Sequence, residues 1–213
     1  MCFSYSCSSV PMDTQKLLQY SNKILLPESM LRKVNQMDDV EYPLFFKITN
    51  PVCGLDRVCA VHEFTAAEGL INIPYYILED LGLTEGSGID VEYINPPTGS
   101  YVKIKPHKTA FIELNDPKAI LETIMSRDYP VITKGQTIII NYEEKAYRID
   151  IVDTKPCEII KIINTDVLLD FDQPHDYVEP IKTKPSSQNN LNVFKQTGQF
   201  IPFSGNGNRL GSV

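Results

Sequence analysis

The three histidines offer the most versatile chemistry in this chain, because an imidazole can ligate a metal or act as a general base. His62, His107 and His175 lie far apart in the sequence, and none has a motif partner nearby. Zinc sites and nucleophile–base pairs both need partners at recognisable spacing, so neither is predicted. We therefore expect surface or structural histidines, no metal and no cofactor.

An acidic run near the end of the predicted folded part offers ligands for a hard cation. Its members are Asp166, Asp170, Asp172, His175 and Asp176. Calcium loops need ligands at alternate positions and a glycine at the sharp turn, whereas the apolar residues 167–169 interrupt this run. The pattern favours the solvated end of a domain.

Signatures of several enzyme classes are missing from the sequence. Aspartic proteases place their carboxylates in Asp-Thr-Gly or Asp-Ser-Gly turns, but Gln15 follows one Asp-Thr pair and Lys155 follows the other. There is no Gly-x-x-x-x-Gly-Lys loop and no Gly-x-Ser-x-Gly elbow. The glycine-rich residues 85–88 are typical of a tight turn. The sequence therefore predicts no catalytic residue.

Large apolar residues return at the C-terminal end after a polar stretch. Phe203 and Leu210 flank two glycines, Gly205 and Gly207. A linear binding motif needs side-chain anchors and a backbone flexible enough to lie along a sheet edge. We predict that this stretch binds a partner protein.

Residues 24–31 and 71–78 share one pattern: a short strand, a proline and the start of a helix. Each copy leads into an alternating strand, at 44–48 and at 89–94. Further strands are predicted at 58–64 and 101–105. Two copies are too few for a solenoid, so a pseudo-two-fold barrel is favoured, with chance similarity as the alternative.

A second, smaller domain is predicted to begin near Asp116, an N-cap residue, and Pro117, at the first position of a helix reaching about Arg127. A hairpin over residues 136–151 and a last strand over 158–163 complete it. Beyond Tyr177 the chain is rich in Pro, Ser, Asn and Gln, a composition typical of a disordered linker.

Charge and cysteine content narrow the partners and the compartment. The chain carries a net charge of −7, although the tail bears Lys182, Lys184, Lys195 and Arg209 against Glu179. An acidic folded part repels phosphate backbones, so nucleic acid is not expected as a partner. The expected partner is a protein with a basic or mixed surface. Five cysteines without metal-type spacing indicate reduced thiols. Neither a signal peptide nor a membrane-spanning segment is predicted.

Two parts of the sequence resemble known proteins. The tail matches Phe-x-Gly-x-Gly-x-x-Leu, the motif of cofactors that bind the N-terminal domain of the valosin-containing AAA ATPase. Residues 21–177 resemble the ubiquitin fusion degradation protein family. The segments that carry the resemblance include Tyr-Pro-Leu-Phe-Phe-Lys-Ile-Thr-Asn at 42–50, Asn-Asp-Pro-Lys-Ala-Ile-Leu-Glu at 115–122, Ile-Asn-Tyr-Glu-Glu-Lys at 140–145 and residues 158–172. No obvious equivalent is seen of the segment with which longer members bind the nuclear protein localization cofactor.

The resemblance implies a mainly β protein with α+β character: a double-psi β-barrel over residues 12–111, a small α+β subdomain over 112–177 and a disordered C-terminal tail over 178–213. It also implies a non-catalytic adaptor that recognises ubiquitin chains and delivers ubiquitylated proteins to the ATPase for proteasomal degradation, including ER-associated degradation.

In that reading the ATPase contacts come from the tail motif at 203–210, namely Phe203, Ser204, Gly205, Gly207, Arg209 and Leu210. The expected location is the cytoplasm and nucleus, including the cytosolic face of the endoplasmic reticulum. The alternatives are a barrel that binds another ligand and an unrecognised barrel enzyme.

Overall fold

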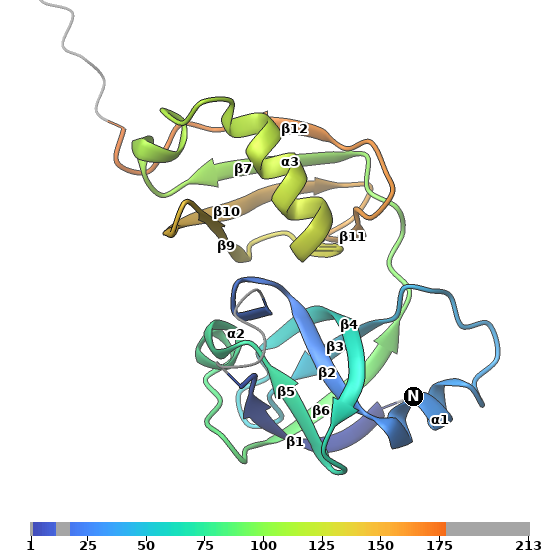
Figure 1. The fold of residues 1–213 in the computed structure, drawn as a ribbon. Coiled ribbons are helices and arrows are strands. Elements are labelled where there is room, and N and C mark those ends of the chain that lie inside the picture. The colour runs from blue at the N-terminus through green and yellow to red at the C-terminus, as the bar shows by residue number, and fades with distance from the viewer. Residues whose placement is uncertain (1, 12–17, 178–213) are drawn as a thin grey trace, which may run out of the picture. The chain divides into compact units, whose positions relative to one another are not determined.

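Six strands close into a barrel in the computed structural model, which describes residues 2–11 and 18–177 (Figure 1). They are β1 (Cys2–Ser9), β2 (Lys23–Pro27), β3 (Phe45–Thr49), β4 (Asp56–Ala66), β5 (Leu70–Ile73) and β6 (Gly88–Ile94). Around the barrel they follow the order β1-β5-β2-β4-β3-β6.

The strand pairing repeats with the sequence pattern. Strand β2 leads into α1 (Glu28–Val34) and pairs in parallel with β4, while β5 leads into α2 (Tyr75–Asp80) and pairs in parallel with β1. The two halves meet through the antiparallel pairs β3–β6 and β2–β5. The two copies found in the sequence therefore occupy equivalent places in the barrel.

Each repeat proline stands one position before its helix and not inside it. Pro27 is extended, at φ −74° and ψ 155°, and ends β2, and Pro74 likewise precedes α2. Its fixed φ suits both an extended residue and a helix start, so the ring can make the change of direction without losing a hydrogen bond.

Alternating residues of the strands fill the barrel. Phe46 and Ile48 of β3, Ile71 and Ile73 of β5, and Val91 of β6 are fully buried. The period of two places every second side chain inside, as the alternation in the sequence predicts.

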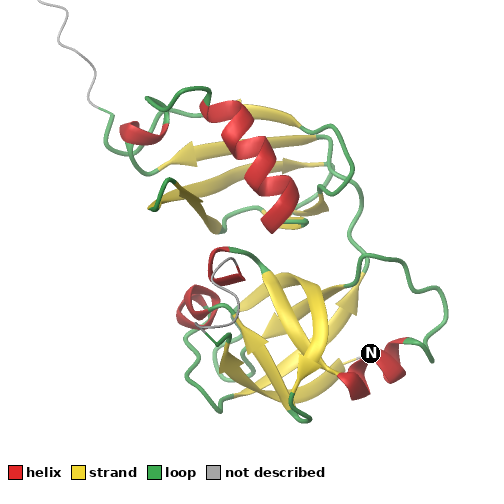
Figure 2. Ribbon diagram, in the orientation of Figure 1, coloured by secondary structure: helices red, strands yellow, loops and turns green. Residues whose placement is uncertain are grey.

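The second subdomain is an α+β unit in which one helix packs on a sheet (Figure 2). Its main sheet has the order β12-β7-β10-β9, with β7 (Tyr101–Pro106), β9 (Thr137–Tyr142), β10 (Lys145–Lys155) and β12 (Leu168–Phe171). A second pair joins β8 (Val131–Thr133) to β11 (Ile159–Lys161). Helix α3 (Pro117–Asp128) shares one apolar core with the sheet. Two single 3-10 turns complete the helical structure of the described residues: η1 (Leu18–Tyr20), before β2, and η2 (Thr109–Phe111), before α3.

The strands of the barrel differ in two places from the range 12–111 predicted for it. Strand β1 precedes residue 12 and contributes Tyr5 and Cys7 to the barrel core. Strand β7 falls inside the predicted range but pairs with β10 and β12 in the second sheet. Alternation shows that a segment is a strand without naming its neighbours, and only the tertiary fold supplies them.

Mainly β structure with few helices agrees with the predicted class. Within the residues described, no helix is long and apolar enough to cross a membrane. The five cysteines are free thiols. The predicted tail, 178–213, lies outside the described residues.

Candidate functional site

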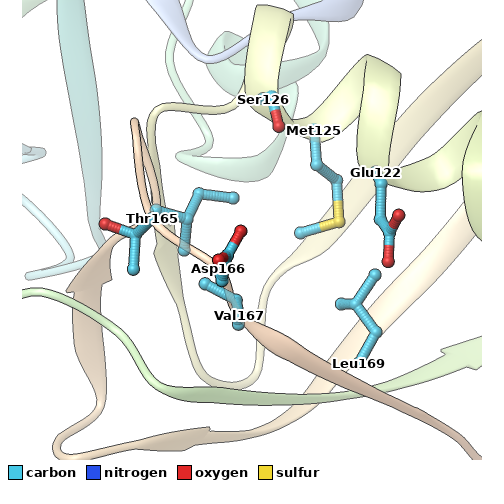
Figure 3. Close-up of a pocket in the computed structure, with 8 residues that line it drawn as sticks. Glu122, Met125, Ser126, Thr165, Asp166, Val167 and Leu169 are labelled. Carbon is cyan, nitrogen blue, oxygen red and sulfur yellow. The ribbon is translucent and has the colours of Figure 1, made fainter.

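A groove opens between α3 and the segment that leads into β12, with a cavity of about 320 Å³ (Figure 3). It is lined by Glu122, Met125, Ser126, Ile162, Thr165, Asp166, Val167 and Leu169. Figure 3 shows the Met125 side chain pointing from α3 toward the 165–169 segment, with Glu122 beside Leu169.

One wall of the groove is a helix face. Glu122, Met125 and Ser126 are spaced three and four residues apart, which places them on one side of α3. Asp116 caps this helix, because its side chain accepts a hydrogen bond of 3.1 Å from the Ala119 N–H. Met125 is buried, while Glu122 and Ser126 are exposed.

The other wall is held to the sheet by backbone hydrogen bonds. The N–H of Ile162 donates to Pro130 O at 2.9 Å, and that of Leu168 donates to Ser100 O at 3.0 Å. Between them the chain turns at Asn164, whose φ is +52°. Asparagine tolerates this left-handed conformation better than most residues, so the turn brings Thr165 and Asp166 to the rim of the groove.

The groove combines an apolar floor with carboxylate and hydroxyl groups at its edge. Neither a histidine nor a cysteine is among the lining residues, and Glu122 lies 3.7 Å from the Lys118 amine along the helix. Such a surface offers apolar contact and hydrogen-bond acceptors to a ligand. It suits a protein segment with apolar and basic side chains.

Most carboxylates of the acidic run are bound to neighbouring elements, two of them to β7 and one to η2. Asp170 accepts a 3.0 Å hydrogen bond from the Tyr101 hydroxyl, and Asp172 lies 3.3 Å from the Lys103 amine. The Lys103 hydrogen bond lowers the pKa of Asp172. Asp176 accepts 2.7 Å hydrogen bonds from the Thr109 N–H and hydroxyl. These carboxylates secure the end of the subdomain, and Asp166 of the same run lines the groove.

Two of the three histidines, none of which has a motif partner nearby in the sequence, meet at one carboxylate. His107 and His175 both lie against Asp150, at 2.7 and 2.8 Å, whereas His62 lies on β4, 3.7 Å from Glu63. No local motif could have shown this, because the residues come from three separate segments. The residues predicted to bind the ATPase are outside the described part of the chain: Phe203, Ser204, Gly205, Gly207, Arg209 and Leu210.

A closed barrel joined to an α+β unit with an acidic, apolar groove defines a two-subdomain protein suited to binding. Family models for the ubiquitin fusion degradation protein UFD1 match residues 1–174 without a gap, N-terminal subdomain 1 at residues 1–97 and N-terminal subdomain 2 at residues 98–174. The chain belongs to the ubiquitin fusion degradation protein family, as its motifs predict. The boundary between the two matches falls between β6 and β7, where the sheets also change.

Individual relatives agree with this assignment. The human "Ubiquitin recognition factor in ER-associated degradation protein 1" is 35% identical over 98% of this chain and 69% of its own length. A "Ubiquitin fusion degradation protein 1 homolog" of Dictyostelium discoideum is 37% identical over 80% of this chain and 51% of its own. The "Ubiquitin fusion degradation protein 1" of Saccharomyces cerevisiae is 35% identical over 76% and 45%.

Proposed function

We propose that this protein is a non-catalytic adaptor that recognises ubiquitin chains and delivers ubiquitylated proteins to the valosin-containing AAA ATPase. The unfolded proteins would then pass to the proteasome, including in ER-associated degradation. The observation that carries the proposal is the family membership, because the human relative that aligns with 98% of this chain is named as a ubiquitin recognition factor.

The groove beside α3 is the contact surface that we assign to ubiquitin. Its floor includes buried Met125 together with Val167 and Leu169, which can cover an apolar patch. Glu122 and Asp166, both exposed, add negative charge at the rim. Opposite charges at a rim steer the encounter and set its specificity, so a basic or mixed partner surface is favoured.

Charge reversal at the rim tests this assignment. The double variant Glu122→Lys and Asp166→Lys should weaken binding of tetra-ubiquitin to the full chain at least tenfold, about 1.4 kcal/mol. The matched control reverses Glu79 and Glu113, two exposed acids away from the groove, with the same change in net charge. Isothermal titration would measure both variants.

Equal affinities for the two double variants would move ubiquitin to another surface. If the unaltered chain failed to bind tetra-ubiquitin, the recognition function itself would be wrong. The first result leaves the family-based function in place, so the two failures can be told apart.

The contact with the ATPase is assigned to the tail motif on its sequence. Phe203 and Leu210 would fill apolar pockets, Arg209 would add a rim ion pair, and the backbone around Gly205 and Gly207 would pair with a strand edge. Titrating the isolated ATPase N-terminal domain with the full chain, with Phe203→Ala and with a chain ending at Asn192 tests this. Phe203→Ala should cut the affinity at least tenfold, and truncation should abolish binding.

Binding that survived the truncation would place the ATPase contact on the folded part.

We also propose that the barrel is of the double-psi type, which the two parallel pairs β1–β5 and β2–β4 at equivalent places support. The proposed location is the cytoplasm and nucleus. A nuclear protein localization cofactor is a further candidate partner, to be sought by co-purification.

A further inference from the structure

Two imidazoles and a carboxylate converge on the second subdomain, away from the groove. His107 Nε2 lies 2.7 Å from Asp150 Oδ1, and His175 Nε2 lies 2.8 Å from Asp150 Oδ2. The two imidazole rings meet edge to face, with their centroids 5.0 Å apart. One potential ligand atom from each residue lies within 4.8 Å of the other two.

The backbone holds all three residues in place. His107 follows β7, and its N–H donates to Arg148 O at 3.0 Å. Asp150 is an inner residue of β10, paired with β7 on one side and β9 on the other. His175 follows β12, and its N–H donates to Pro106 O at 3.1 Å. Three segments far apart in sequence thus present their side chains to one point.

This donor set is one that zinc prefers. Zinc in proteins takes imidazole nitrogen and carboxylate oxygen at about 2.0–2.2 Å, usually in a tetrahedral arrangement. We propose that His107, His175 and Asp150 bind a zinc ion, with water in the fourth position. The contacts of 2.7 and 2.8 Å are shorter than the separation of two tetrahedral ligands, about 3.3 Å from those bond lengths. Small rotations of the rings would admit the ion.

The surroundings provide access and an outer hydrogen bond. The His107 and His175 side chains are 35% and 48% exposed, so an ion and its water can reach them. Thr137 Oγ1 donates to Asp150 Oδ1 at 2.7 Å, the kind of outer contact that orients a ligating carboxylate. Lys105 of β7 pairs with Asp150 in the strand register, and its positive charge disfavours a second cation nearby. It also lies near Asp172, whose negative charge offsets that of Lys105.

Zinc at this point would fasten the segment after β12 to β7 and β10. That segment is the last described part of the chain and precedes the predicted linker. The ion would therefore stiffen the end of the folded part, independently of the ubiquitin and ATPase contacts proposed above.

The full chain, prepared without a polyhistidine tag, allows a direct test because its sequence has three histidines. One equivalent of zinc chloride should shift the imidazole nitrogen resonances of His107 and His175 and leave those of His62 in place. Long-range proton–nitrogen spectra of the unaltered protein read this out, so the result does not depend on whether a variant folds.

Isothermal titration with zinc chloride supplies the second measurement. Binding should saturate at one ion per chain, and His175→Ala and Asp150→Asn should each weaken it at least tenfold, while His62→Ala should leave it unchanged. Exposed thiols of Cys2, Cys53 and Cys157 could compete. Cobalt substituted at the proposed site should therefore show no thiolate charge-transfer band.

Four results would overturn the proposal. Three are unshifted resonances of His107 and His175, the absence of saturation at one ion, and equal zinc affinity in His175→Ala and the unaltered chain. The fourth is a strong thiolate band with cobalt, which would assign the binding to the cysteines instead.

Discussion

At the residue scale, burial controls the chemistry of the cysteines. Cys59 is fully buried in the barrel, and this burial raises the pKa of its thiol to about 12. Burial also raises the pKa of Cys7, while Cys2, Cys53 and Cys157 are exposed. Because the thiolate is the nucleophile, the buried pair should be protected from thiol reagents.

A thiol titration with Ellman's reagent at about pH 8, near the ordinary thiol pKa, tests this protection. The exposed cysteines should react quickly, and Cys7 and Cys59 only after denaturation. The folded state holds the Cys59 proton more tightly than the unfolded state. Its contribution to stability is therefore present below the ordinary pKa and lost as the pH rises toward about 12. Rapid reaction of Cys59 in the folded chain would contradict the burial.

Asn22 joins the barrel to the second subdomain through a buried amide. The residue is 1% exposed, its side-chain NH₂ donates to Val131 O, and its backbone N–H donates to Asp128 O at 3.2 Å. Asn22→Ala would leave the Val131 carbonyl without this donor, so the free energy of unfolding should fall by about 1–3 kcal/mol. Urea unfolding would measure this loss.

Gln36→Ala serves as the control, because Gln36 carries the same kind of amide but is exposed after α1. Its effect should stay within about 0.5 kcal/mol. Similar losses for the two variants would show that the Asn22 contact contributes little.

At the element scale, the start of α3 depends on one residue in an unusual conformation. Asp116 has φ +59° and accepts the hydrogen bond from Ala119 N–H that caps the helix. Asp and Asn tolerate the left-handed region, whereas alanine does not. The residue therefore meets two requirements, a side-chain cap and a positive φ.

Three substitutions of Asp116 separate these requirements. Asp116→Ala loses both and should lower the free energy of unfolding by about 1–3 kcal/mol, from the cap and the left-handed strain together. Asp116→Gly keeps the backbone freedom and should cost less, and Asp116→Asn should cost least. Thermal unfolding would rank them, and an Ala variant as stable as the Asn variant would contradict both roles.

At the scale of the folded part, barrel and second subdomain share buried side chains. Phe45, Val58 and Ala60 of the barrel form one cluster with Val131 of β8, each at most 1% exposed. Arg57 adds a polar contact, donating to Gln136 Oε1 at 3.1 Å. An apolar cluster this well buried couples the stability of the two subdomains.

We therefore expect the two subdomains to unfold in one cooperative transition. Amides of β3–β4 and of β9–β10 should lose protection from hydrogen exchange at the same urea concentration. Val131→Ala should leave a small cavity and lower the free energy of unfolding by about 1–2 kcal/mol. Both midpoints should then move together to a lower urea concentration. Separate midpoints for the two sets of amides would show that the shared cluster does not couple them.

The sequence by itself determined the features that depend on neighbours along the chain. Alternation revealed the strands at 44–48 and 89–94, the paired prolines revealed the repeat, and Asp116 with Pro117 located α3. The motifs also revealed the family. These signals are local because backbone periodicity and capping involve residues within a few positions of one another.

Only the tertiary structure decided which distant segments meet. Alternation in β7 fits either sheet, and its hydrogen bonds to β10 and β12 assign it to the second. The serine-rich β1 carries a weak strand signal and gains its place from pairing with β5 and β6. The groove beside α3 and the meeting of His107, His175 and Asp150 arise in the same way. Long-range pairing creates these sites, and no short stretch of sequence contains them.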